Sequence, residues 1–184
     1  MTAPTYPAPF ALADWLERHK DKLKPPVSNK MLFDDGSGMI VQIIGGGNKR
    51  TDFHDDPAYE FFYQLKGSMI LKVHEGSSVR DVRINEGDVF LLPGNVPHSP
   101  QRPDPDSIGL VVEGPRLPGM IDGFEWYCFN CGTKVARVEV ELKDIVKDLP
   151  PLFEAFYADE ARRTCPSCGE LHPGVQPPAG WVEL

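Results

Sequence analysis

Short apolar or alternating runs fill the middle of the chain. Between residues 31 and 112 these runs are MIVQII, EFFYQL, SMILKVHE, DVRI, DVFLLP and SIGLVVE. A Gly, Asn, Asp or Pro separates each run from the next, which is typical of short strands joined by tight turns. A series of such strands predicts an antiparallel sandwich or barrel. The pattern therefore predicts a mainly β fold.

The two ends of the chain have a different pattern. Residues 8–23 place apolar residues at helical spacing and predict one amphipathic helix that ends before Pro25 and Pro26. Residues 114–123 have the composition of a linker, and the run WYCFNCGTKVARVEVEL then predicts a cysteine knuckle followed by an alternating strand. Residues 143–170 predict a helix and a second knuckle. We expect a barrel with its N-terminal helix over residues 1–120 and a small C-terminal segment over 121–184.

The cysteines form two Cys-x-x-Cys pairs with none left over: Cys128, Cys131, Cys165 and Cys168. The N-terminus has no secretory pattern, so disulfides are not expected, and paired knuckles predict one tetrahedral thiolate site. Four thiolates leave no open position, which favours a structural role. The spacing does not distinguish iron from zinc. His172 follows the second pair and is a spare donor that a closed site does not need.

Composition and charge restrict the partners. The chain has 184 residues, 41% of them hydrophobic, and a formal net charge of −8. An acidic chain without a long basic run is a poor candidate for binding nucleic acid. No apolar run approaches the ~20 residues of a membrane helix. We expect a cytoplasmic protein with a small-molecule partner, and neither nucleic acid nor membrane.

The stretch HDDPAYE places His54 and Glu60 six residues apart across Pro57. The proline disfavours a helix, whereas an extended segment with an even offset puts both side chains on one side. His98 ends the stretch INEGDVFLLPGNVPH, where a Pro-Gly-Asn turn directs it inward. Two imidazoles and one carboxylate suit Fe(II) and leave coordination positions open. The alternative is that the three residues are unrelated and that His98 only caps a turn.

Three charged residues surround these candidate ligands. Arg50 precedes His54 by four residues, Arg102 follows His98 by four, and Glu113 ends an apolar strand. Guanidinium groups bind carboxylates in a bidentate way, so the arginines predict a carboxylate-bearing substrate. A partly buried Glu113 would suit proton transfer. By spacing alone, all three could equally be surface charges near strand ends.

The spacing of these residues resembles the two halves of the cupin motif, in Gly47, His54, Glu60 and Gly67, then Gly87, Pro93, Asn95 and His98. The resemblance implies a double-stranded β-helix, or jelly-roll barrel. Two positions depart from the motif. Asp56 stands where the usual second histidine would be, and Asn95 replaces a glycine, which the tolerance of Asn for positive φ explains.

Longer runs resemble the 3-hydroxyanthranilate 3,4-dioxygenase family, in GGGNKRTDFHDDPAYEFFYQLKG, FLLPGNVPHSPQRP, GLVVEGPR, CFNCG and CPSCG. The likeness extends from about Asn29 to Pro173 and is to the bacterial form with an added cysteine-ligated metal. It implies a non-haem Fe(II), extradiol-type enzyme, commonly a homodimer, that acts in tryptophan degradation through kynurenine. With O2 such an enzyme opens the ring to 2-amino-3-carboxymuconate semialdehyde, which leads to quinolinate and NAD.

The resemblance also implies roles for single residues. His54, Glu60 and His98 would bind the catalytic iron, and the four cysteines a rubredoxin-like iron. The residues that would contact the substrate are Arg50, Arg102, Glu113 and Asn29, with Arg50 and Glu113 also catalytic. The competing hypotheses are a non-catalytic cupin sensor or binding protein, a cupin isomerase, and a cupin dioxygenase for another carboxylated phenol.

Overall fold

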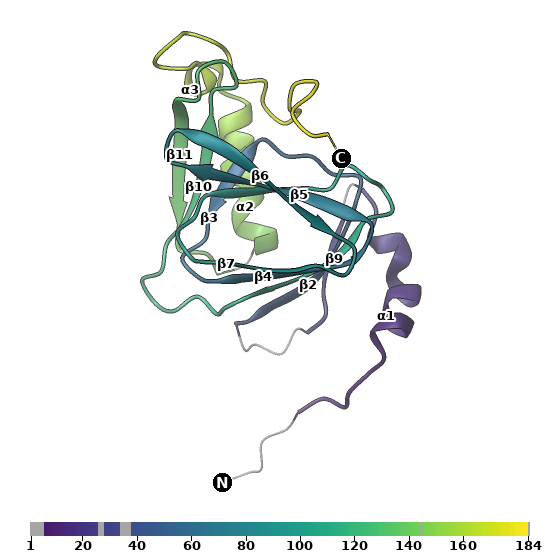
Figure 1. Cartoon of the computed structure of the whole chain (residues 1–184). Coiled ribbons are helices and arrows are strands. Elements are labelled where there is room, and N and C mark those ends of the chain that lie inside the picture. The colour runs from purple at the N-terminus through teal and green to yellow at the C-terminus, as the bar shows by residue number, and fades with distance from the viewer. Residues whose placement is uncertain (1–5, 26–27, 34–37, 144, 184) are drawn as a thin grey trace.

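The computed structural model describes residues 6–25, 28–33, 38–143 and 145–183. Two antiparallel sheets face each other (Figure 1). The first has the order β1 (Asn29–Met31), β2 (Ile40–Gly45), β9 (Ile108–Glu113), β4 (Glu60–Lys66) and β7 (Val89–Leu92). The second has the order β11 (Lys134–Val140), β10 (Asp122–Tyr127), β3 (Asp52–Asp55), β8 (His98–Gln101), β5 (Ser68–Glu75) and β6 (Ser78–Asn85). The prediction of a mainly β, cupin-type jelly roll is confirmed.

The space between the sheets holds an apolar core. In β4, alternate residues point inward, so Phe62 is buried while Phe61 on the opposite side is exposed. The buried side chains of this core are Phe62, Met69, Leu71, Val73, Ile84, Leu92 and Val111. Burying each one contributes on the order of 1.5–3 kcal/mol. This apolar half of the barrel supports the polar residues that occupy the other half.

The N-terminal helix is shorter than predicted. α1 (Leu12–His19) and the 3-10 turn η1 (Lys20–Lys22) replace the expected helix over residues 8–23. Ala8 precedes Pro9 and therefore avoids helical backbone angles, which excludes a start at residue 8, and the helix begins after Ala11, whose backbone is extended. Trp15 of α1 is buried with Leu23 and with Ile43 of β2, so the helix covers one end of the first sheet.

The C-terminal part of the chain continues the second sheet. β10 pairs with β3 from Gly123 to Trp126, and β11 pairs with β10. The linker prediction for residues 114–123 is therefore wrong from Asp122 onward. The division into segments at residue 120 stays a prediction, although backbone pairing runs across the sheet that both segments share.

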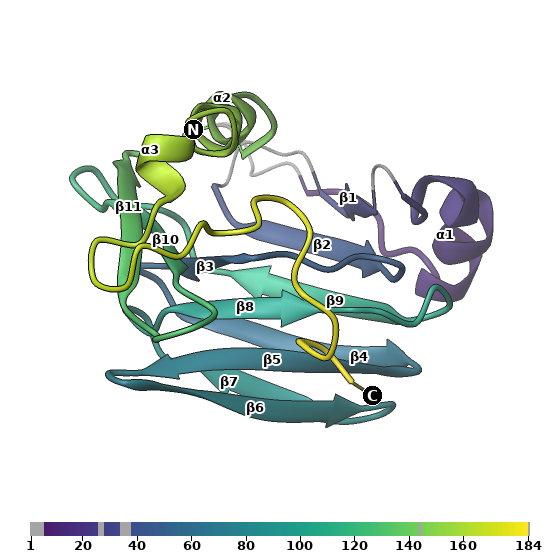
Figure 2. The ribbon, with the colours of Figure 1, turned by 90° about the horizontal axis from the view of Figure 1, so that it is seen from above.

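Two helices follow β11: α2 (Ile145–Tyr157), which contains Pro150 and Pro151, and α3 (Glu160–Arg163). Figure 2 shows α2 lying against the end of the sandwich that β10 and β11 form. Phe156 of α2 stacks on Trp126 of β10 with ring centroids 4.0 Å apart. The chain then crosses the second sheet, where Trp181 lies with its ring 4.1 Å from Lys72 Nζ.

Candidate active site and cysteine site

The two sheets bring the predicted triad together. His54 of β3 and His98 of β8 are directly opposite in register in the second sheet. Glu60 of β4 lies in the first sheet, opposite Glu113 of β9. His54, Glu60 and His98 each offer a ligand atom within 4.8 Å of the others, and all three are buried.

The sequence predicted that HDDPAYE is extended and bent at Pro57, so that His54 and Glu60 face one pocket; the two side chains do meet, but the stretch is divided between two strands. β3 ends at Asp55, and the Asp56 carboxylate closes a turn by accepting a hydrogen bond from the Ala58 N–H (2.7 Å). β4 then starts at Glu60 in the other sheet. His54 and Glu60 therefore approach each other from facing sheets rather than from one side of one strand.

Each histidine has one ring nitrogen held by an acceptor. His54 Nε2 lies 2.8 Å from Asp122 Oδ1, and His98 Nδ1 lies 2.9 Å from the Val96 carbonyl oxygen. A carboxylate and a carbonyl are acceptors, so these nitrogens donate, and the other nitrogen of each ring is the one that would bind a metal ion after losing any proton it carries. Those two, His54 Nδ1 and His98 Nε2, lie 3.5 and 2.9 Å from Glu60 Oε1. Glu60 Oε1 is buried, and beyond these two imidazole contacts it forms no hydrogen bond within the described ranges.

This donor set fits a divalent metal ion. Two imidazole nitrogens and a carboxylate oxygen point at one place, and an acceptor behind each imidazole is the arrangement that orients metal-bound histidines. Buried carboxylates near the triad add negative charge, which a bound cation would neutralise. Asp56, Glu60, Glu113 and Asp122 are all buried, and Arg116 lies 2.8 to 2.9 Å from Asp56, Glu113 and Asp122.

Burial and neighbouring charges shift the pKa values of His54 and Glu113. Burial opposes the charged form of His54, but its contacts with Asp122 and Glu60 raise its pKa to about 10. Burial and the neighbouring Glu60 raise the pKa of Glu113 to about 8. Burial likewise raises the pKa of Asp56 to about 6. Glu113 is buried, as the sequence led us to expect.

Arg116 and Asp122 were missed by the sequence reasoning. Both lie in the stretch assigned to a linker, where charged residues are ordinarily solvated. Their roles depend on contacts with residues about 60 positions away, which no local pattern signals. The structure also explains why Asp56 occupies the position of the second histidine of the cupin motif. Asp56 binds Arg116 and the Ala58 N–H, which leaves three residues of the usual four-ligand set.

Arg50 is held beside the site. Its guanidinium forms an ion pair with Asp52. Burial opposes the charge of Arg50, but Asp52, with further contributions from Tyr157 and Glu60, raises its pKa. Gln101 fixes the backbone of Arg50 from both sides, by accepting from its N–H (3.1 Å) and donating to its carbonyl oxygen (2.9 Å).

Arg102 is a buried cation without a counter-charge. Its side chain is 1% exposed, and Nη1 donates to Gln64 Oε1 (2.6 Å) and lies 3.4 Å from Ser107 Oγ. No carboxylate within the part of the chain that the structure describes forms an ion pair with it. Burial lowers its pKa to about 10. A buried guanidinium in this state is stabilised by any anion that reaches it.

The structure does not bring Asn29 to the triad. Asn29 begins β1, its side chain is exposed, and its backbone is in register with Ile44 of β2. Its predicted role in binding the substrate stays a prediction. The turn before His98 agrees with the motif, since Asn95 has a φ of 61° where the cupin pattern has glycine.

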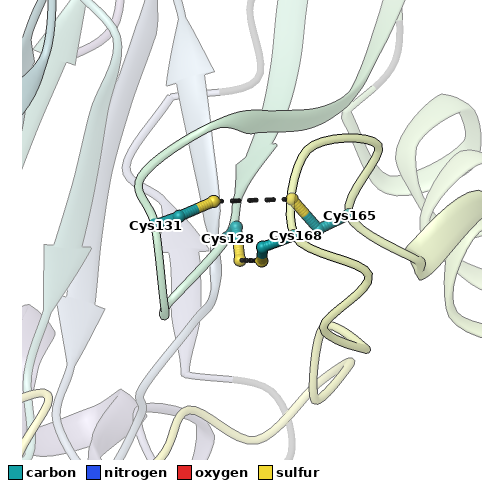
Figure 3. A group of neighbouring side chains, drawn as sticks. All are labelled: Cys128, Cys131, Cys165 and Cys168. Atoms are coloured by element: carbon teal, nitrogen blue, oxygen red, sulfur yellow. Dashed lines mark hydrogen bonds between the residues drawn. The ribbon is translucent and has the colours of Figure 1, made fainter.

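The four cysteines form a second compact group (Figure 3). Cys128 and Cys168 have sulfur atoms 3.6 Å apart, as do Cys131 and Cys165, and all four are free thiols. A tetrahedron with metal–sulfur bonds of about 2.3 Å has edges of about 3.8 Å. After each pair a glycine with positive φ turns the chain so that its N–H donates back to the first cysteine's carbonyl oxygen. The geometry fits one tetrahedral metal ion.

The fold and the triad define the class: a cupin with the two-histidine, one-carboxylate ligand set that non-haem metal oxygenases use. The chain belongs to the 3-hydroxyanthranilic acid dioxygenase family, which matches residues 6–157. The family implies a metal cofactor. Among the described residues no helix is long and apolar enough to cross a membrane.

Curated relatives match nearly the whole chain. The 3-hydroxyanthranilate 3,4-dioxygenase of Ruegeria pomeroyi is 57% identical over 175 residues, which cover 95% of this chain and 97% of that protein. The enzyme of the same name from Shewanella woodyi is 58% identical over 177 residues, covering 96% and 93%. That from Brucella anthropi is 56% identical over 177 residues, covering 95% and 97%.

Proposed function

We propose that the chain is a non-haem Fe(II) dioxygenase that opens the ring of 3-hydroxyanthranilate with O2 to give 2-amino-3-carboxymuconate semialdehyde. The observation that carries the proposal is the convergence of possible ligand atoms of His54, Glu60 and His98 within one barrel that also buries Arg102, which forms no ion pair within the described residues. The first feature supplies a metal centre and the second an attraction for a carboxylate. Relatives that bear this enzyme's name match the chain nearly end to end.

His54, Glu60 and His98 would hold the iron. When bound, Fe(II) supplies adjacent coordination positions for the substrate and O2 and a route for electrons between them. The chain's own contribution is to orient these ligands, because Asp122 fixes the ring of His54 and the Val96 carbonyl fixes the ring of His98.

The charged neighbours would bind and orient the substrate. Arg102 provides the buried cation for its carboxylate, and Arg50 provides a second guanidinium at the partly exposed edge of the site. Glu113 titrates near neutral pH, so it can exchange a proton with the hydroxyl group of the ring. Arg116 keeps Glu113 in place through a 2.8 Å ion pair.

The cysteine site would hold iron or zinc as a structural ion, because its four thiolates leave no position open for a substrate. Closing the two knuckles joins the end of β10 to the segment after α3. A red, oxidisable colour in the purified protein would indicate iron, and a colourless protein with bound zinc would indicate the other metal.

The exposed side chains of Phe61, Val89 and Leu91 on the first sheet support the proposed homodimer, since apolar side chains grouped on one face favour association. Sedimentation of the purified protein tests this assignment. A cytoplasmic location and a place in tryptophan degradation, before quinolinate and NAD formation, remain predictions from the family.

One experiment tests the function. Protein loaded with Fe(II) without air is mixed with 3-hydroxyanthranilate and O2, and O2 uptake is followed together with absorbance of the opened ring. Equal amounts of O2 consumed and product formed are the expected result. A folded, iron-loaded protein that consumes no O2 would exclude this activity and favour the binding-protein hypothesis. Uptake only with another carboxylated phenol would change the substrate and keep the class.

A further inference from the structure

A hydrogen bond links the active-site strand to the segment that follows the second cysteine pair. Thr51 lies between Arg50 and Asp52, and its hydroxyl donates to the carbonyl oxygen of Gly174 at 2.6 Å. Both Thr51 and Gly174 are buried. The hydroxyl also lies within hydrogen-bonding reach of Tyr157 of α2. A buried hydroxyl with a short bond to a backbone carbonyl helps to fix the backbone on either side of it.

The residues on both sides of Thr51 belong to the proposed substrate site. Arg50 forms its ion pair with Asp52, and its backbone is held by Gln101. The backbone of Asp52 is in turn paired with Trp126 of β10. Three consecutive residues are therefore held by three different parts of the chain: Arg50 by β8, Thr51 by the segment after the second cysteine pair, and Asp52 by β10.

Gly174 is itself held firmly. Its N–H donates to His172 Nδ1 at 3.1 Å, and His172 is buried. The backbone of His172 is bound to Arg163 in both directions, since its N–H donates to the Arg163 carbonyl (2.9 Å) and its carbonyl accepts from Arg163 Nη1 (2.7 Å). These contacts place the segment immediately after the second knuckle, which contains Cys165 and Cys168.

The first knuckle is also connected to the residues beside Thr51. β10 pairs with Asp52 through Trp126 and continues directly into Cys128. Cys128 and Cys168 have sulfur atoms 3.6 Å apart (Figure 3). The cysteine site thus joins two segments of the chain, one of which contacts Thr51 through Gly174 and the other Asp52 through Trp126.

We infer that Thr51, His172 and Gly174 form a clamp through which the cysteine-bound segment positions Arg50 for the substrate carboxylate. The inference rests on the proposed function, because it takes Arg50 as a substrate-binding residue. Thr51 and His172 are positioning residues here and do not touch the substrate. The clamp gives the distant cysteine site a role in substrate affinity without any transfer of electrons.

The test replaces Thr51 with Val, which keeps the shape and removes the donor, and with Ser, which keeps the donor. Binding of 3-hydroxyanthranilate to the Fe(II) protein is measured without O2, together with binding of 2-aminophenol, which lacks the carboxylate. Loss of one hydrogen bond predicts that Thr51→Val weakens 3-hydroxyanthranilate binding about three- to tenfold. Thr51→Ser should restore it, 2-aminophenol binding should not change, and the metal content of both sites should remain that of the wild type.

A second pair of variants tests the clamp from the C-terminal side. His172→Asn keeps an acceptor near the Gly174 N–H and should bind like the wild type, whereas His172→Phe removes it and should show the same carboxylate-specific loss. Equal weakening of both ligands, or no change in Thr51→Val and His172→Phe, overturns the clamp alone. A wild-type protein that binds 3-hydroxyanthranilate no better than 2-aminophenol overturns the proposed carboxylate site, and the clamp with it.

Discussion

Asp122 is expected to tune the metal affinity of the triad without touching the metal. It is fully buried, and its Oδ1 lies 2.8 Å from His54 Nε2 and 2.9 Å from Arg116 Nη2. The substitution Asp122→Asn keeps the shape and an oxygen acceptor and removes the negative charge. Arg116 retains Asp56 and Glu113 as partners, so the change leaves no unpaired cation.

The size of the effect follows from the single hydrogen bond from His54. A bond to a charged acceptor contributes about 1.5–3 kcal/mol and a bond to a neutral one about 0.5–1.5 kcal/mol. The difference of about 1 to 1.5 kcal/mol corresponds to a roughly tenfold loss of metal affinity. This value agrees with the tenfold to hundredfold losses that follow when the partner of a metal-bound histidine is changed.

The assay titrates metal-free protein with Co(II) in competition with a chelator. Thiolate-bound cobalt gives intense charge-transfer bands, so the cysteine site is followed separately and serves as an internal control. Asp81→Asn is a matched control, because Asp81 pairs with Lys72 and belongs to neither candidate metal site. If Asp122→Asn bound cobalt at the triad as tightly as Asp81→Asn, the argument that Asp122 orients His54 would be refuted.

Three further outcomes follow from the site. Arg102→Met should retain its metal and its folding stability, because burial already opposes the charge. It should weaken 3-hydroxyanthranilate binding at least tenfold and leave 2-aminophenol binding unchanged, and calorimetric titration of both ligands decides this. Glu113→Gln should lower kcat about a hundredfold and remove the pH dependence of kcat/KM near pH 8, and an unchanged pH profile would count against proton exchange by Glu113. Burial, then Arg163, lowers the pKa of His172 to about 4, so the unfolded chain binds the extra proton between pH 6.5 and 4. The free energy of unfolding should therefore fall over this range by at most about 3 kcal/mol, and the decline in His172→Asn, measured by urea unfolding, should be smaller.

The strands that follow a hydrophobic period could be predicted, and the strands that lack one could not. β4 and β9 alternate fully buried positions with more exposed ones, and the sequence located both. All residues of β10 are buried, since α2 covers one side of the strand and aromatic side chains the other, so its sequence shows no period of two. That is why DGFEWY was divided between a linker and a knuckle.

The candidate ligands could be located in the sequence, but the residues that orient them could not. The spacing of His54, Glu60 and His98 identified the triad, although it suggested one strand where the structure has two. Asp122 and Arg116 depend on pairing between β3 and β10, which joins residues about 70 positions apart. Such pairing is a property of the complete sheet, so no local pattern of residues contains it.

The division of the triad between the two sheets has a consequence for the lifetime of the protein. An ion bound by His54 and His98 from one sheet and by Glu60 from the other is a reversible cross-link through the barrel. Any ligand that binds only the folded state adds to its stability, by about 4 kcal/mol at a thousand times the dissociation constant. The folded fraction is therefore tied to the supply of metal, and a shortage of that metal should remove the protein by unfolding as well as stop its chemistry.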